Sequence, residues 1–290
     1  MNWEMMTLQY FYLFPVAILV AAVAMASGVG GATFFTPIFI LGLGLPAEVA
    51  IGVGLITEVF GFISGLYAYA KKKLVDYGLG LTLLVVTVPM ALIGTWVAGY
   101  VDSEILKVIL GVGLFAIALS FLRAPDHHDV VIMDDVIEDE YGGNNAETCV
   151  VTSDGEQICY TVCNKNEGRL ISGVGGLFVG MISTGLGKLN GYFLLQRCRV
   201  PSAVSVATSV FVVAFTAFAA ATGHVAQFLQ ADSEVMALVF SIVIFTVPGV
   251  IIGAQLGSRV ARRISQHTLE RALGVLFILV AVLTLGEAIL

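Results

Sequence analysis

The sequence predicts an all-α polytopic membrane protein with two related halves in opposite orientations and a small soluble insert. Three observations lead to this fold class. Charged residues make up 12% of the 290 positions and hydrophobic residues 58%, whereas a soluble domain carries roughly 25% charge. Long apolar segments recur along the chain, so lipid is the expected solvent. The two halves also carry the same sequence markers in the same order.

Each half begins with a broken apolar segment and continues with three segments long enough to cross a bilayer. In the first half, glycines at 28–31 separate the arms 10–27 and 33–43. The spans that follow are 47–70, 79–100 and 104–122. In the second half, a break at 185–188 separates the arms 170–183 and 190–196, and the spans are 203–224, 235–256 and 269–290.

Four pairs of markers indicate an internal duplication. They are Gly28-x-Gly30 with Gly185-x-Gly187, Pro46 with Pro201, Pro89-x4-Gly94 with Pro248-x4-Gly253, and Leu106-x4-Gly111 with Leu269-x4-Gly274. The alternative is chance similarity among glycine-rich apolar segments. The common order and similar offsets favour duplication.

The loop charges predict the orientation of the halves. If each broken segment is a re-entrant hairpin, the loop cations share one side, including 71–73, Arg197 and Arg199, with Lys107 as the exception. If each break crosses once, these cations divide between both sides, against the positive-inside rule. A twelve-residue arm also reaches only about 18 Å of a roughly 30 Å core. Three full spans per half then give an inverted repeat, with both termini outside and the insert cytoplasmic.

The predicted domains are a first transmembrane repeat at 1–123, an acidic soluble cytoplasmic insert at 124–168 and a second transmembrane repeat at 169–290. The insert holds 11 acidic residues and one lysine, and three of the four cysteines. A two-residue Asp154-Gly155 turn predicts a β-hairpin that pairs Ser153 with Glu156. Cys149 would then lie beside Tyr160, with Cys159 on the other face. We expect reduced thiols in the cytoplasm, and no metal site.

Both halves resemble one family of membrane proteins. The residues are Gly28-Val-Gly30-Gly31, Pro37 and Leu45-Pro46-x3-Ala50-x-Gly52 in the first half, Val200-Pro201-x5-Ala207-Thr208-Ser209 in the second, and the two Pro-x4-Gly spans. This pattern resembles the sulfite exporter (TauE/SafE-type) transporters over about 10–123 and 170–290. The resemblance implies movement of sulfite, sulfonates or related small anions. Val53-Gly54 departs from the Thr-Ser that the family often has there, and Lys188 replaces a small residue.

The two breaks are the predicted substrate site. Each second arm begins at the tip of a hairpin, so its free N–H groups and positive dipole end face the midplane, where they can bind an anion. Thr33 and Asn190 are the expected N-caps. The alternative is that the glycines only allow close helix packing. The predicted substrate-binding residues are Gly28, Gly30, Gly31, Thr33, Gly185, Gly187, Lys188, Asn190, Thr208 and Ser209.

Two ionisable residues fall inside predicted membrane segments. Lys188 is expected to neutralise a bound anion, or else to extend its ammonium to the interface. Glu58 is the one carboxylate in the middle of a span. Burial favours its neutral form, which makes it a candidate proton carrier or a hydrogen-bonded structural residue. His224 is expected at the interface, outside the site.

These features predict a secondary transporter in the plasma membrane that moves a small sulfur-containing anion by alternating access, coupled to an ion such as H⁺. We expect export, with no catalytic residue, no cofactor and no nucleic-acid partner. A homo-oligomer is left open. Two alternatives also stay open: an anion channel gated by the acidic insert, and a membrane-embedded sulfur-transfer enzyme that uses Cys198. Walker, HExxH and GxSxG motifs are absent from the sequence.

Overall fold

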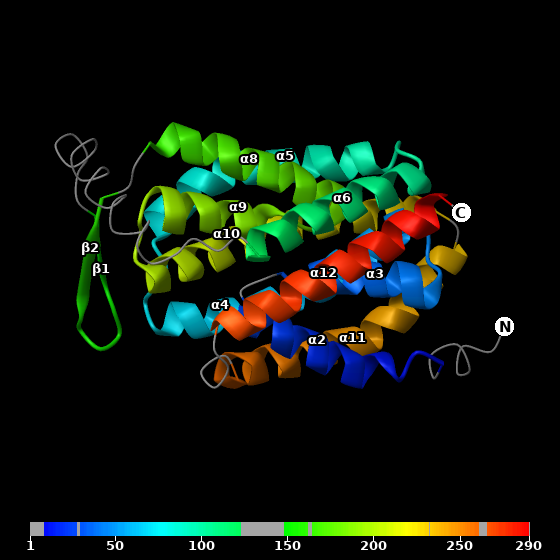
Figure 1. Ribbon diagram of the computed structural model, residues 1–290, viewed down its shortest axis with the longest axis horizontal. Helices are drawn as coiled ribbons and strands as arrows, with labels where there is room; N and C mark the ends of the chain where they lie inside the picture. Colours follow the sequence, from blue (N-terminus) through cyan, green and yellow to red (C-terminus); the bar gives the residue numbers. More distant parts are fainter. Residues whose placement is uncertain are drawn as a thin grey trace.

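The computed structural model describes residues 9–27, 30–122, 148–161, 164–231, 233–260 and 266–289. This part of the chain forms a helical bundle with one two-stranded sheet at its end (Figure 1). Six of the described helices are long and apolar enough to cross a membrane. They are α4 (Ala47–Lys71), α5 (Tyr77–Ala98), α6 (Ser103–Leu122), α10 (Ser202–Gln230), α11 (Ser233–Val260) and α12 (Gln266–Ile289). The six predicted spans are therefore confirmed as helices.

The two predicted broken segments form shorter helices. They are α2 (Leu13–Ser27) and α3 (Ala32–Leu43) in the first half, and α8 (Lys165–Ile182), α9 (Leu186–Gly191) and the π-helix η1 (Tyr192–Arg197) in the second. In the second break, Ser183 ends α8 in the left-handed region, and Gly185 has φ +110°. An L side chain rarely adopts that backbone conformation, so the turn requires glycine at position 185.

Helix pairing interlocks the two halves. The most extensive contacts join α2 to α11 and α8 to α5, while α4 packs on α10 and α6 on α12. Glycines allow the close approach. The backbone of Gly253 faces Ile18 and Ala21 of α2, and that of Gly180 faces α5. Each half therefore places its first arm against the other half.

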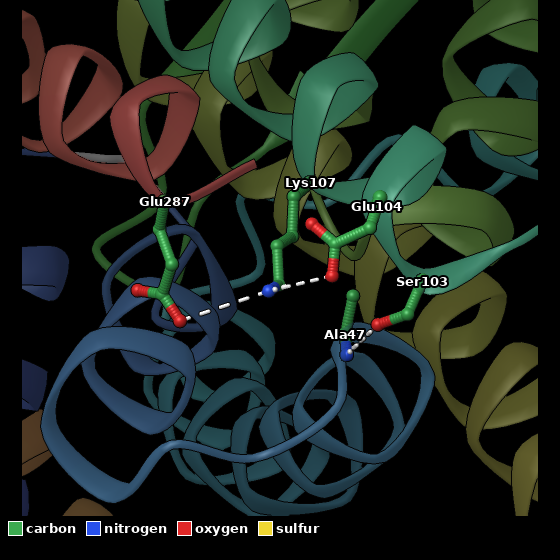
Figure 2. A network of polar contacts seen from close by, with 5 residues as sticks. All are labelled: Ala47, Ser103, Glu104, Lys107 and Glu287. Atoms are coloured by element: carbon green, nitrogen blue, oxygen red, sulfur yellow. Dashed lines mark hydrogen bonds and ion pairs between the residues drawn. The ribbon is translucent and has the colours of Figure 1, made fainter. Parts of the chain in front are cut away.

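Acidic side chains collect at one end of the bundle. There, the backbone N–H of Ala47 donates to Ser103 Oγ at 2.8 Å, and Lys107 Nζ lies 3.1 Å from Glu104 and 3.6 Å from Glu287 (Figure 2). Lys107 is the cation that fell on the acidic side in the sequence prediction. Its position is explained because two carboxylates neutralise it there.

The β-hairpin exists, but its predicted register is wrong by one residue. Strands β1 (Thr148–Val151) and β2 (Gln157–Tyr160) pair Cys149 with Cys159, not with Tyr160. The turn has three residues and closes where the Thr152 N–H donates to the Glu156 carbonyl at 2.9 Å. A two-residue type I′ turn needs positive φ at both central residues. Here Gly155 has φ +84°, and Asp154 is not in the positive region.

The expectation of reduced thiols is also wrong. Cys149 and Cys159 lie directly opposite each other on the exposed face of the hairpin and form a disulfide. Cys198, at the end of η1, is disulfide-bonded as well. The corrected register explains the first bond, because it brings both thiols to one face.

The inner face of the hairpin docks on the helices. The Tyr160 hydroxyl donates to Asp76 Oδ2 at 2.7 Å, and the Ser153 N–H donates to the Lys72 carbonyl at 3.0 Å. Val150 and Ile158 pack on the buried cluster that includes Phe193. Burial raises the pKa of Tyr160 well above its usual range, and the hydrogen bond to Asp76 and the charge of that carboxylate raise it further. The hairpin is thus fixed to the end of the bundle opposite the C-terminal end of α12 (Figure 1), where Glu287 pairs with Lys107.

Candidate substrate site between the two helix breaks

A cavity of about 40 Å³ lies where the two breaks meet. This volume holds about three water molecules. Its walls come from both halves of the chain. The lining residues are Gly30, Thr33, Glu58, Phe62, Ile117, Val179, Ser183, Thr184, Gly185, Leu186, Gly187, Lys188, Ser209, Val210 and Val213.

Most of the predicted site residues come together here. The cavity is lined by Gly30, Thr33, Glu58, Gly185, Gly187, Lys188 and Ser209. Gly31 does not line it but lies next to Gly30 at the start of α3. Gly28 is outside the described residues.

Asn190 and Thr208 are buried away from the cavity lining. The Ser172 hydroxyl donates to Asn190 Oδ1 at 2.8 Å, so this amide joins the two arms of its own half. Thr208 Oγ1 accepts from the Asp76 N–H at 3.0 Å, which ties α10 to the start of α5. The expectation that Thr33 and Asn190 are N-caps is wrong. Helix α3 begins after Gly31 and α9 after Gly185, both without a side-chain cap, and Asn190 lies in the last turn of α9.

Glu58 reaches the cavity from the middle of α4, and its side chain is buried. Its carboxyl group lies beside Gly30 and faces the backbone N–H groups of Gly31 and Ala32. These donors belong to the first turn of α3, the positive end of that helix. A Cβ on Gly30 would collide with Glu58 Oε1. Glycine at position 30 therefore lets the carboxyl group reach the helix end.

Lys188 enters the cavity from α9, and its Nζ lies 3.2 Å from the ring centroid of Phe121 on α6. A cation over an aromatic face is stabilised by the ring quadrupole. The ammonium group is thus held inside the bundle, with Phe121 on one side and the cavity within its reach.

Hydroxyl groups connect the two breaks directly. Thr33 and Thr184 share a hydrogen bond of 2.7 Å, and Thr36 and Ser183 one of 2.6 Å. A Cβ on Gly54 would lie 2.7 Å from Thr36 Oγ1. The glycine that departs from the family pattern thus leaves room for the Thr36 hydroxyl group. Ser209, the residue of the second half that corresponds to Gly54, lines the cavity.

Sequence reasoning missed Ser183, Thr184 and Phe121. Ser183 and Thr184 directly precede Gly185, so small polar residues beside a break were the available signal. Phe121 gave no signal, since aromatic residues are common in apolar spans. His224 is fully buried, and its Nε2 lies 3.0 Å from the Gly180 carbonyl. The expectation that it lies at the interface is wrong.

Comparison with known proteins adds independent information. The profile of the sulfite exporter TauE/SafE family matches residues 13–284. The chain is 25% identical over 246 residues to the "Probable membrane transporter protein YunE" of Bacillus subtilis (strain 168), covering 83% of this chain and 82% of that protein. No solved structure matches the chain.

Proposed function

Because the chain belongs to the sulfite exporter TauE/SafE family, a family of membrane transporters and not of enzymes, we propose that it moves small sulfur-containing anions across the plasma membrane. The substrate site is the cavity between the two breaks. The observation that carries this proposal is the convergence of Lys188, hydroxyl groups and the start of α3 on one small space. A cation, hydroxyl donors and a helix N-terminus are the groups that bind oxyanions.

The two halves form an inverted repeat. The pairing of α2 with α11 and of α8 with α5 is what exchange of equivalent helices between two related halves produces. The equivalent helices α4 and α10 also run in opposite directions. Helix α4 begins beside Ser103, whereas α10 begins near Asp76, at the opposite end of α5. Alternating access then follows as a rocking of one half against the other around the cavity.

The basic end of the bundle faces the cytoplasm, and the chain termini lie outside. Basic residues gather at the helix ends that point towards the β-hairpin. They are Lys71, Lys72, Lys73, Lys165, Arg169, Arg197 and Arg199. The Cys149–Cys159 disulfide favours an extracellular hairpin instead, because disulfides persist mainly in oxidising compartments. The loop cations carry the assignment, since they direct membrane insertion. A cytosolic disulfide is then a redox-responsive one.

Sidedness can be tested on intact cells. After mild reduction, a membrane-impermeant maleimide should label Cys159 only in permeabilised cells, because Cys159 lies on the exposed face of the hairpin. Labelling of intact cells after an impermeant reductant would place the hairpin outside and reverse the assignment. Cys149→Ser/Cys159→Ser is the control for background labelling.

Flux measurements test the function itself. Purified protein in liposomes should take up or release radiolabelled sulfite, thiosulfate or a sulfonate with saturation kinetics, and we expect export as the direction in cells. Saturation distinguishes this transporter from an anion channel. Flux that persists in Cys198→Ser excludes sulfur transfer through that residue. Empty liposomes are the control, and absence of flux for every anion would refute the proposal.

A further inference from the structure

Glu58 occupies the position where a helix N-terminus would hold an anion. Its carboxyl group lies beside Gly30 and Gly31 and faces the N–H groups of Gly31 and Ala32, two donors at the start of α3. Its side chain also lines the cavity. An anion that bound the start of α3 would therefore need the same two donors. The carboxylate and the substrate are alternative partners of one helix end.

The charges of the cavity also disfavour an anion beside an ionised Glu58. Among the described residues that line it, Glu58 and Lys188 are the ionisable ones. The other elements around Glu58 contribute hydroxyl and apolar groups, from Thr33 of α3, Ile117 of α6 and Ser209 of α10. An ionised Glu58 already balances Lys188. A monoanion would then give the cavity a net charge of −1, whereas a protonated Glu58 keeps it neutral.

The size of the cavity makes this exclusion strong. In about 40 Å³, a bound anion would lie roughly 5 Å from the Glu58 carboxylate. Repulsion between two unit charges at that distance weakens binding by about a hundredfold or more at an effective dielectric constant near 20. Protonation of Glu58 removes the repulsion and, since a neutral carboxyl is a weaker acceptor, also releases the donors of α3.

We propose that Glu58 is a tethered competitor of the substrate, so that the anion binds together with a proton on Glu58 and both cross the membrane in the same direction. This inference rests on the proposed function and adds its coupling, under which net export requires an outward anion gradient larger than the inward proton gradient. The substrate favoured by the charge balance is a monoanion, such as a sulfonate. Exchange of the proton for the anion, as in an antiporter, would require the anion to enter beside the ionised carboxylate.

The test uses liposomes that contain the full-length protein and a pH-sensitive dye, with the membrane potential clamped. Methanesulfonate is the probe because it is a strong acid and has no membrane-permeant neutral form. With equal pH on both sides, its addition outside should acidify the lumen at a rate that matches its uptake. Uptake with no pH change, or with alkalinisation, overturns the inference. Absence of uptake refutes the proposed function instead.

Glu58→Gln supplies the second measurement. The glutamine oxygen can still accept from α3, so the fold is preserved, but its charge no longer changes with pH. This variant should carry methanesulfonate without acidifying the lumen, and its apparent affinity should vary less than threefold between pH 6 and 8. Glu104→Gln at the acidic end is the matched control and should stay proton-coupled. Coupling retained in Glu58→Gln would overturn the inference, and the wild-type measurement still decides if the variant does not fold.

Discussion

Removal of the Lys188 ammonium group should weaken anion transport about tenfold. In the structure, Nζ lies over Phe121 and at the wall of the cavity, so a bound anion would lie about 5 Å from it. At an effective dielectric constant of 20, that attraction is about 3 kcal/mol. Rearrangement of the cation–π contact with Phe121 costs about 1–2 kcal/mol of this. The remaining 1–2 kcal/mol corresponds to roughly a tenfold change.

The assay is saturable uptake of a sulfonate and of sulfite by Lys188→Ala in liposomes, read as kcat/KM. Lys107→Ala is the matched control, because it also removes a largely buried lysine but lies at the acidic end. Lys188→Arg should not restore transport, since a planar guanidinium group is bulkier and hydrogen-bonds differently. Normal kcat/KM for every anion in Lys188→Ala would show that the ammonium group is not in the site.

Three further predictions follow from the packing. Gly30→Ala should lose most transport, because its methyl group would displace the Glu58 carboxyl group. Gly42→Ala, inside the α3 helix that follows Gly30, has open space and should transport normally; equal transport by both would contradict the assigned contact. Gly180→Ala places a Cβ 2.7 Å from the Thr95 nitrogen and should lower stability by about 1–3 kcal/mol, measured as a lower Tm in detergent, while Gly286→Ala should not. Tyr160→Phe should weaken hairpin docking by about 1–2 kcal/mol and speed proteolysis of the insert at neutral pH. Because the pKa of Tyr160 is raised on folding, its contribution is present below about pH 10 and is lost as the pH rises further, so wild type should approach the variant only in strong alkali.

The helices could be predicted from the sequence because their signals are local. The span predicted at 79–100 is α5, Tyr77–Ala98, since apolar length is a property of one segment. The second break was equally visible, because Gly185 and Gly187 interrupt an apolar run. Local composition thus located the long helices and the second break.

The contacts inside the site could not be predicted in the same way. The sequence places Glu58 in mid-span and Gly30 in a break, but their meeting depends on α3 folding back along α4. The hairpin shows a related difficulty. Asp154-Gly155 is compatible with a two-residue or a three-residue turn, and a shift of one residue moves every side chain to the other face. The cysteine pairing depended on that choice.

The exchange of helices between the halves has a consequence for biogenesis. Helix α2 leaves the ribosome long before α11, yet the surface of α11 that it covers begins only at Ser233. Until α11 is synthesised, the first half stays in the bilayer with its first arm, α2, unpaired. Assembly is therefore a late event that closes both halves together, and long sequence separation makes such contacts slow to form. A first half expressed alone should be degraded, and co-expression of the second half should rescue it.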